Sequence, residues 1–181
     1  DGDARLAARI QEIARAWRLA TRRLPLADGR FNLLVSCEAG ADAEWLLFES
    51  HLDTVSTAGM TIPPLTLAEH GGKLHGRGAC DTKGSGAAML WALRNYAAQP
   101  VRPRSAGVLF VVDEEAGMSG AQAFAAKELR EFRRLRGIIV GEPTMLRPVV
   151  SHNGALRWRS VTRGRAARTQ HPRPGAAAPP G

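Results

Sequence analysis

Apolar residues in this chain recur with helical spacing in some stretches and gather in short runs in others. A repeat every three or four residues, with arginines between, predicts an amphipathic helix over residues 3–20, carried by Leu6, Ile10, Ile13 and Trp17. Short apolar runs predict buried strands at residues 31–37, 45–48, 108–112 and 137–140. Further helices are predicted at residues 83–98 and 119–129, the latter with Ser119 as its candidate N-cap. Strands that alternate with helices indicate an α/β fold, in layers, with a largely parallel sheet.

The segments between and after these elements differ in character. Residues 56–80 contain Pro63-Pro64 and Gly71-Gly72 and form a long predicted loop, and long loops in compact domains tend to be functional. Residues 148–162 alternate weakly and indicate the start of a second, smaller sheet. Residues 168–181 are rich in Pro, Arg and Ala, so we expect a disordered low-complexity tail.

The net charge of +8 comes from one end of the chain. Residues 1–142 hold 18 Lys and Arg against all 17 acids, a net charge of +1, whereas residues 143–181 hold seven Arg and no acid. Only Trp158 lies among these arginines, so the stacking aromatics of a nucleic-acid-binding module are missing. We therefore predict no nucleic-acid partner; a tail that contacts acidic partners stays an alternative.

Membrane and secretory signals are weak. No apolar run approaches the ~20 residues that span a bilayer, and the N-terminal Asp1-Gly2-Asp3 does not open a secretory signal. Cys37 and Cys80 are too few for a disulfide framework. We therefore predict no membrane association and a cytoplasmic location. The chain does not begin with Met, so further residues are expected upstream.

Metal-binding side chains follow the predicted strands and the glycine-rich end of the long loop. They are His51, Asp53, Asp81, Glu114, Glu115 and Glu142. Since ligands of α/β sheets bind beyond the carboxyl ends of the strands, three strand ends bring such groups to one edge. One His and several carboxylates form the ligand set of a site for two divalent metals with a carboxylate base beside it.

Each of these residues also has a structural interpretation. His51 offers one imidazole nitrogen to a metal, and Asp53 is placed to accept a hydrogen bond from the other nitrogen. An isolated His in a loop is more often a surface residue. Asp81 precedes a predicted helix and alternatively caps it. Glu114 and Glu115 repel each other, which a nearby cation relieves, although a solvated acidic loop is the alternative.

Four motifs together resemble the M20 family of metallopeptidases and deacylases, which includes acetylornithine deacetylase, succinyl-diaminopimelate desuccinylase and carboxypeptidase G2. They are His51-Leu-Asp-Thr-Val, Gly76-Arg-Gly-Ala-Cys-Asp-Thr-Lys-Gly, Asp113-Glu-Glu and Gly141-Glu-Pro. The resemblance implies a layered α/β/α zinc-peptidase-like catalytic domain, followed by a lid domain that mediates dimerisation. It also implies hydrolysis of an amide bond in a small N-acyl amino acid or peptide substrate.

The resemblance implies a role for each site residue. The first metal would bind His51, Asp81 and Glu142, and the second would bind Asp81 as a bridge, Glu115 and a His late in the family's fold. Glu114 would be the general base, with Asp53 supporting catalysis behind His51. Zinc suits these mixed ligands best, with cobalt or manganese as alternatives.

The end of the chain departs from the family pattern. We expect a partial catalytic domain over residues 1–146, the beginning of a lid over residues 147–167 and the tail over residues 168–181. Where the family has a substrate-binding His, this chain has Arg168-Thr-Gln-His171, and the late metal-binding His is missing. These features indicate a truncated or frameshifted chain, and the short lid weighs against the family's homodimer. The alternative function is a catalytically inactive remnant that binds at most one metal.

Overall fold

The structure is a computed structural model that describes residues 2–154, 158–161, 163, 165–166 and 176–177. The chain divides into two compact units, Asp1–Leu146 and Arg147–Gly181. All of the candidate site residues lie in the first unit.

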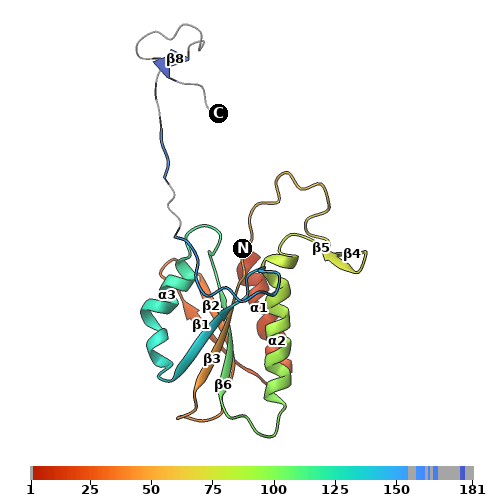
Figure 1. Cartoon of the computed structure of the whole chain (residues 1–181), viewed down its shortest axis with the longest axis vertical. Helices are drawn as coiled ribbons and strands as arrows, with labels where there is room; N and C mark the ends of the chain where they lie inside the picture. Colours follow the sequence, from red (N-terminus) through yellow and green to blue (C-terminus); the bar gives the residue numbers. More distant parts are fainter. Residues whose placement is uncertain (1, 155–157, 162, 164, 167–175, 178–181) are drawn as a thin grey trace. The chain divides into compact units, whose positions relative to one another are not determined.

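The first unit is built on a five-stranded sheet with strand order β1-β2-β6-β3-β7 (Figure 1). β3 pairs in parallel with both β6 and β7, whereas β2 pairs antiparallel with β1 and β6. Four strands therefore run in one direction and β2 runs against them, which confirms the predicted α/β fold with a mostly parallel sheet. The strands are β1 (Ala20–Pro25), β2 (Phe31–Cys37), β3 (Trp45–His51), β6 (Ser105–Val111) and β7 (Leu135–Val140).

Helices cover both faces of this sheet (Figure 1). α1 (Gly2–Ala16) and α2 (Gly84–Ala97) lie on one face, and α3 (Ser119–Lys127) lies on the other. Because successive strand residues point to opposite faces, β6 sends Val108 and Phe110 towards α1 and α2, and sends Leu109 and Val111 towards α3. β6 is buried along its whole length, so it forms the centre of the unit and fixes where the neighbouring strands end.

The first helix and the first strand differ from the prediction. The helical pattern predicts a helix as far as residue 20, but α1 ends at Ala16 and β1 begins at Ala20. Arg18 adopts a left-handed conformation with φ 59°, which turns the chain between them. β1 is an edge strand in which only Leu24 is buried, so its apolar signal is too weak to show in the sequence.

The predicted long loop contains a small hairpin of β4 (Ala68–His70) and β5 (Lys73–His75). Its two turn residues, Gly71 and Gly72, have φ values of 58° and 70°, the left-handed conformation that two-residue hairpin turns require.

The N-terminus of α3 also differs from the prediction. Ser119 does not cap the helix; the Asp113 carboxylate accepts hydrogen bonds from the Ser119 N–H at 3.2 Å and from its hydroxyl at 2.6 Å.

The second unit contains little regular structure where it is described. Two-residue strands β8 (Arg165–Ala166) and β9 (Ala176–Ala177) pair in parallel. Residues 147–154 and 158–161 form no strand, although weak alternation there predicts the start of a sheet. The predicted disordered tail over residues 168–181 lies outside the described residues, apart from β9. None of the helices in the described part of the chain has the length and apolar character to cross a membrane.

Candidate metal centre

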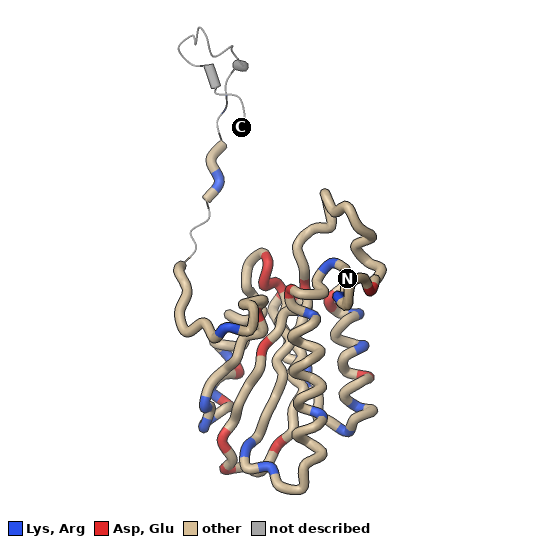
Figure 2. The backbone as a smooth tube through the Cα atoms, turned by 45° about the vertical axis from the view of Figure 1, so that its right-hand side comes forward, with Lys and Arg blue, Asp and Glu red and all other residues tan. Residues whose placement is uncertain are grey.

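Three parallel strands bring acidic side chains to one edge of the sheet. β3 ends at His51, β6 at Val111 and β7 at Val140, and the acids follow directly in the chain. Figure 2 shows Asp and Glu residues gathered at this edge, which is also where the N-terminus lies. The predicted convergence of the strand ends is therefore present in the fold.

His51 is the buried centre of this edge, with 2 % of its surface exposed. Its Nδ1 lies 3.0 Å from the backbone carbonyl oxygen of Asp53. A carbonyl can only accept, so Nδ1 carries a hydrogen, which leaves Nε2 as the nitrogen available to a metal. Nε2 lies 2.9 Å from Asp81 Oδ1 and 3.9 Å from Glu142 Oε1. Burial lowers the pKa of His51, but hydrogen bonds with Asp81 and Asp53 outweigh burial, and the net shift is upward.

Asp81 lies in the tight turn η1 (Ala79–Lys83), between the long loop and α2. The turn begins at Gly78, whose φ is +78° and where a Cβ would lie 2.8 Å from Thr54 Cγ2 and 2.9 Å from Lys83 Nζ. Asp81 makes no capping hydrogen bond to α2, whose N-cap is Lys83. Its side chain is half exposed and faces His51, so the alternative helix-cap interpretation does not fit the structure.

Asp53 contacts the site differently from the prediction. Its nearer contact with His51 Nδ1 is through its backbone carbonyl, and its carboxylate Oδ1 lies 3.5 Å from that nitrogen. The carboxylate instead accepts hydrogen bonds from the backbone N–H groups of Glu114 at 3.1 Å and Glu115 at 3.0 Å. Asp53 therefore joins the end of β3 to the acidic loop after β6.

Glu114, Glu115 and Glu142 bring three further carboxylates close to His51. Burial raises the pKa of Glu114, although the positive charge of His51 opposes this shift, and Glu115 adds to it. Burial also raises the pKa of Glu142, with the negative charge of Asp81 adding to the shift. The carboxylates therefore repel one another, and a bound cation would relieve this repulsion.

Sequence reasoning misses a set of buried and half-buried hydroxyls behind these acids. Thr82 is fully buried, and its hydroxyl lies 2.7 Å from Ser50 Oγ. The same hydroxyl oxygen accepts a hydrogen bond from the backbone N–H of His51 at 3.2 Å. The hydroxyl of Ser85 lies 2.7 Å from the Thr82 carbonyl oxygen and 2.5 Å from that of Gly141. Ser and Thr are common in turns and helix starts, so no signal in the sequence marks these residues.

Glu49 and Lys83 are two charged residues near the site that sequence reasoning also misses. Burial raises the pKa of the Glu49 carboxyl to about 7, with the charge of His51 opposing this shift. Its Oε1 is buried and has no hydrogen-bond partner among the residues that the structure describes. The Lys83 ammonium donates to the Leu52 carbonyl oxygen at 3.1 Å. Burial lowers the pKa of Lys83, and the nearby charge of Asp3 opposes that shift.

The donor atoms fit a site for divalent cations. One group comprises His51, Asp81 and Glu142, and a second comprises His51, Glu114 and Glu115, with ligand atoms within 4.8 Å of one another in each group. Imidazole nitrogen together with carboxylate oxygens suits Zn²⁺, Co²⁺ or Mn²⁺. Among the described residues the two groups share His51, whereas the family resemblance implies sharing through Asp81.

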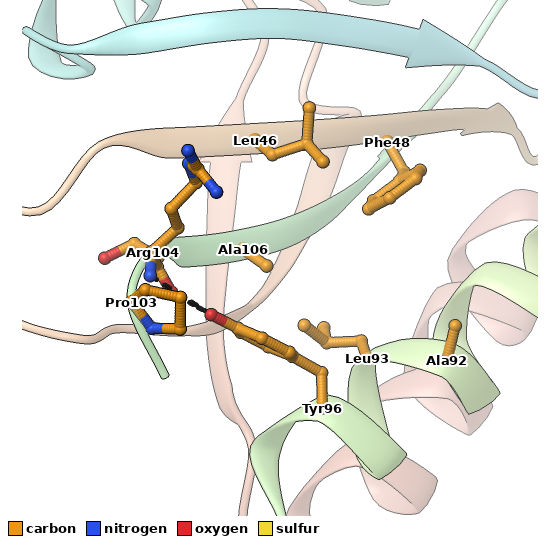
Figure 3. A pocket seen from close by; sticks show the side chains of 9 residues that line it. Leu46, Phe48, Ala92, Leu93, Tyr96, Pro103, Arg104 and Ala106 are labelled. Carbon is orange, nitrogen blue, oxygen red and sulfur yellow. Dashed lines mark hydrogen bonds between the residues drawn. The ribbon is translucent and has the colours of Figure 1, made fainter. Parts of the chain in front are cut away.

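One cavity in the first unit lies away from this site. It has a volume of about 260 Å³ and lies between α2 and the opening residues of β3 and β6, at the opposite end of the strands (Figure 3). Its wall is apolar, and the hydroxyl of Tyr96 donates to the Arg104 carbonyl oxygen at 2.6 Å. A cavity of about 150 Å³ lies beside His51 between α1 and α2. Residue chemistry, rather than cavity size, marks the candidate site.

The fold matches peptidases of known structure over most of the chain. Human carnosine dipeptidase 1 matches with a TM-score of 0.63 and 23 % identity, over 75 % of this chain and 32 % of that one. The M20 family metallo-carboxypeptidase Sso-CP2 of Sulfolobus solfataricus matches with a TM-score of 0.67 and 18 % identity, over 78 % and 32 %. The YXEP protein of Bacillus subtilis, a dinuclear metal binding peptidase from the M20 family, has a TM-score of 0.52 and 14 % identity, over 75 % and 36 %.

These likenesses concern the fold, and the chain spans 32–36 % of the length of these three structures. The family match is independent of the fold comparison. The model of peptidase family M20/M25/M40 matches residues 47–177, which include His51, Asp81, Glu114, Glu115 and Glu142. The chain belongs to peptidase family M20/M25/M40.

Proposed function

We propose that this chain carries the metal-binding part of an M20 hydrolase that cleaves amide bonds in small N-acyl amino acids or peptides. The observation that carries the proposal is the pair of three-donor groups that meet at the buried His51. Family membership supports the class of reaction. Because the chain spans only part of its solved relatives, both activity and substrate remain proposals.

The residues divide into metal ligands and reacting groups. His51, Asp81 and Glu142 would hold one divalent ion, for which zinc is the best candidate. Glu115 and Asp81 would hold a second ion. His51 belongs to both three-donor groups, which supports a pair of ions close to this side chain. When bound, such ions supply Lewis-acid chemistry that polarises an amide carbonyl and makes water more acidic.

Glu114 is proposed as the general base. Its carboxylate would take a proton from the attacking water as the water oxygen bonds to the carbonyl carbon. It would then give that proton to the amide nitrogen as the carbon–nitrogen bond breaks. Asp53 supports this role because its carboxylate holds the backbone N–H groups of both Glu114 and Glu115. These bonds fix the loop after β6 against the end of β3, so the position of Glu114 relative to the metal ligands is also fixed.

The proposed location is the cytoplasm. Cys37 and Cys80 are both free thiols in the structure, which supports a reducing compartment.

The test is to measure bound zinc and hydrolysis in the same preparation of the 181-residue chain, with a panel of N-acyl amino acids and dipeptides. Zinc binding with hydrolysis supports the proposal. At most one bound zinc without hydrolysis supports the alternative of a catalytically inactive remnant, and a chain that binds no zinc contradicts the proposed metal-dependent hydrolase. In an active preparation, Glu114→Gln should abolish turnover and leave the zinc content unchanged, and substantial remaining turnover would exclude Glu114 as the base.

A further inference from the structure

The carboxylates of the candidate metal centre arrive on segments that are far apart in the chain. Asp81 comes from the turn η1, and Glu142 follows β7 some sixty residues later. Both side chains are substantially exposed, with 50 % and 41 % of their surface accessible, so packing of the side chains themselves does not fix their separation. Both backbone segments are also bonded to β3, Thr82 through its hydroxyl and Gly141 through its N–H, and one further side chain makes a direct contact between them.

Ser85 makes that contact. Its hydroxyl lies within hydrogen-bonding distance of two backbone carbonyl oxygens, that of Thr82 at 2.7 Å and that of Gly141 at 2.5 Å. Thr82 follows Asp81 directly, and Gly141 precedes Glu142 directly. Within the described part of the chain, Ser85 is the only side chain with hydrogen bonds to both segments.

The approach is close because Gly141 has no side chain. A Cβ at Gly141 would lie 2.8 Å from Ser85 Oγ, 2.9 Å from Met89 Cε and 3.0 Å from the Glu49 carbonyl oxygen. The Gly141 N–H also donates to that Glu49 carbonyl at 2.9 Å. The end of β7 is thus held between β3 on one side and Ser85 on the other.

A hydroxyl between two carbonyl oxygens acts as a shared donor. Both oxygens carry partial negative charge, so without the hydroxyl hydrogen they would repel each other and separate or admit water. Any such movement passes directly to the neighbouring residues Asp81 and Glu142. Contacts that orient metal ligands from behind affect metal affinity by about 10- to 100-fold in other proteins.

We propose that Ser85 is a positioning residue that sets the separation of Asp81 and Glu142 and thereby the affinity of the site for a divalent metal. The inference rests on the proposed function, because it requires these two carboxylates to bind the same ion. Its mechanism is geometric and involves no change in the charge of the site.

The test compares the zinc affinity of Ser85→Ala with that of wild type, by competition with a chromophoric chelator. Ser105→Ala is the matched control, because Ser105 is fully buried, accepts one backbone N–H from Ala39 at 3.0 Å, and lies at the opposite end of the sheet. Urea unfolding of each metal-free variant identifies any loss of stability. Ser85→Ala should weaken zinc binding by about tenfold, whereas Ser105→Ala should lower the unfolding midpoint and leave zinc affinity within about twofold of wild type.

A double-variant comparison separates positioning from general loosening. If Ser85 acts through Glu142, then adding Ser85→Ala to Glu142→Ala should change the remaining zinc affinity by less than about twofold. A full tenfold loss in that background would overturn the proposal, as would equal affinities for Ser85→Ala and Ser105→Ala. Should Ser85→Ala not fold, Ser85→Cys replaces the hydroxyl by a larger thiol that is a weaker donor, so it should also separate the two carbonyl oxygens, and wild-type affinity in that variant would also overturn the proposal.

The two proposals fail in different ways. A wild-type chain that binds no zinc removes the proposed function and this inference together. A wild-type chain that binds zinc, with Ser85→Ala binding equally well, removes only the inference about Ser85.

Discussion

The amide of Asn32 should be a main determinant of stability next to the candidate site. Asn32 is fully buried in β2. Its Nδ2 donates to the Gly120 carbonyl oxygen at 2.8 Å, and its Oδ1 accepts the Val112 N–H at 3.2 Å. One side chain thus joins β2 to the end of β6 and to the first turn of α3. We predict that Asn32→Ala destabilises the protein strongly.

The magnitude follows from the two groups that the substitution leaves behind. The Gly120 carbonyl would lose the amide donor, and the Val112 N–H would lose its acceptor. Because Gly120 lies in the first turn of α3, its carbonyl is also the acceptor for the helical N–H four residues on, and only the Val112 N–H is left without the acceptor that Asn32 provides. A buried polar group without a partner costs about 1–3 kcal/mol, which is the expected loss. Small domains have about 5–15 kcal/mol of stability in total, so this loss is a large share of it. The site is also tightly closed, since a Cβ at Gly120 would lie 2.6 Å from Asn32 Oδ1.

The assay is urea unfolding of the metal-free protein, followed by circular dichroism, with Asn95→Ala as the control. Asn95 lies on the exposed face of α2, so its substitution should change the free energy of unfolding by less than about 0.5 kcal/mol. In a thermal scan the predicted loss for Asn32→Ala corresponds to at least about 2 °C in Tm. If Asn32→Ala lowers the free energy of unfolding by less than about 1 kcal/mol, the argument from buried unpaired groups is refuted for this position.

Three further predictions concern single acids around the site. Asp81→Ala should reduce bound zinc, measured by mass spectrometry of the metal content, and unchanged stoichiometry would contradict its role as a ligand. Asp53→Asn keeps one acceptor oxygen but faces the other backbone N–H with a donor, so kcat should fall about 10- to 100-fold with zinc retained; wild-type kcat would refute this role. The Ser119 hydroxyl and then the Arg30 guanidinium lower the pKa of Asp113, so its stabilising effect is full above about pH 4 and is lost as the pH falls further. The difference in unfolding free energy between wild type and Asp113→Asn should therefore shrink from pH 6 towards pH 2, and a constant difference would show that the charge of Asp113 is not involved.

The elements that the sequence predicts correctly are those with strong local patterns. The apolar runs of β2, β3, β6 and β7 all appear as strands. β2 and β6 are buried along most of their length, whereas Ile138, Ile139 and Val140 of the edge strand β7 are exposed, so its apolar run predicts a strand correctly but a buried strand wrongly. β1 has no such apolar run, because an edge strand with one buried residue, Leu24, resembles a polar linker in sequence. The hairpin β4–β5 has no apolar run either, since each of its strands has three residues, and all of these except the partly buried His75 are exposed.

The candidate site is visible in the sequence for a chemical reason. Carboxylates gathered at the ends of neighbouring strands repel one another unless a cation binds them, so Glu114, Glu115 and Glu142 stand out from their surroundings. The partner of each side chain is harder to predict. Asp53 is two residues from His51, which suggested a contact between its carboxylate and the ring, but the backbone carbonyl takes that place. The carboxylate is then free to accept from residues sixty positions away.

The residues that escape prediction share one property, which is that their role depends on a distant backbone group. Asn32 bonds to Gly120, 88 positions along the chain, and Ser85 bonds to Gly141, 56 positions along. Neither Asn nor Ser carries a charge or an apolar surface that would show a preference for its position, so periodicity and composition say nothing about them. The acids supply the chemistry of the centre, but they repel one another and provide no force that assembles it. The neutral hydrogen bonds of Thr82 and Ser85 hold the segments that carry these acids, so substitution of Ser85 should weaken metal binding even though every ligand is still present.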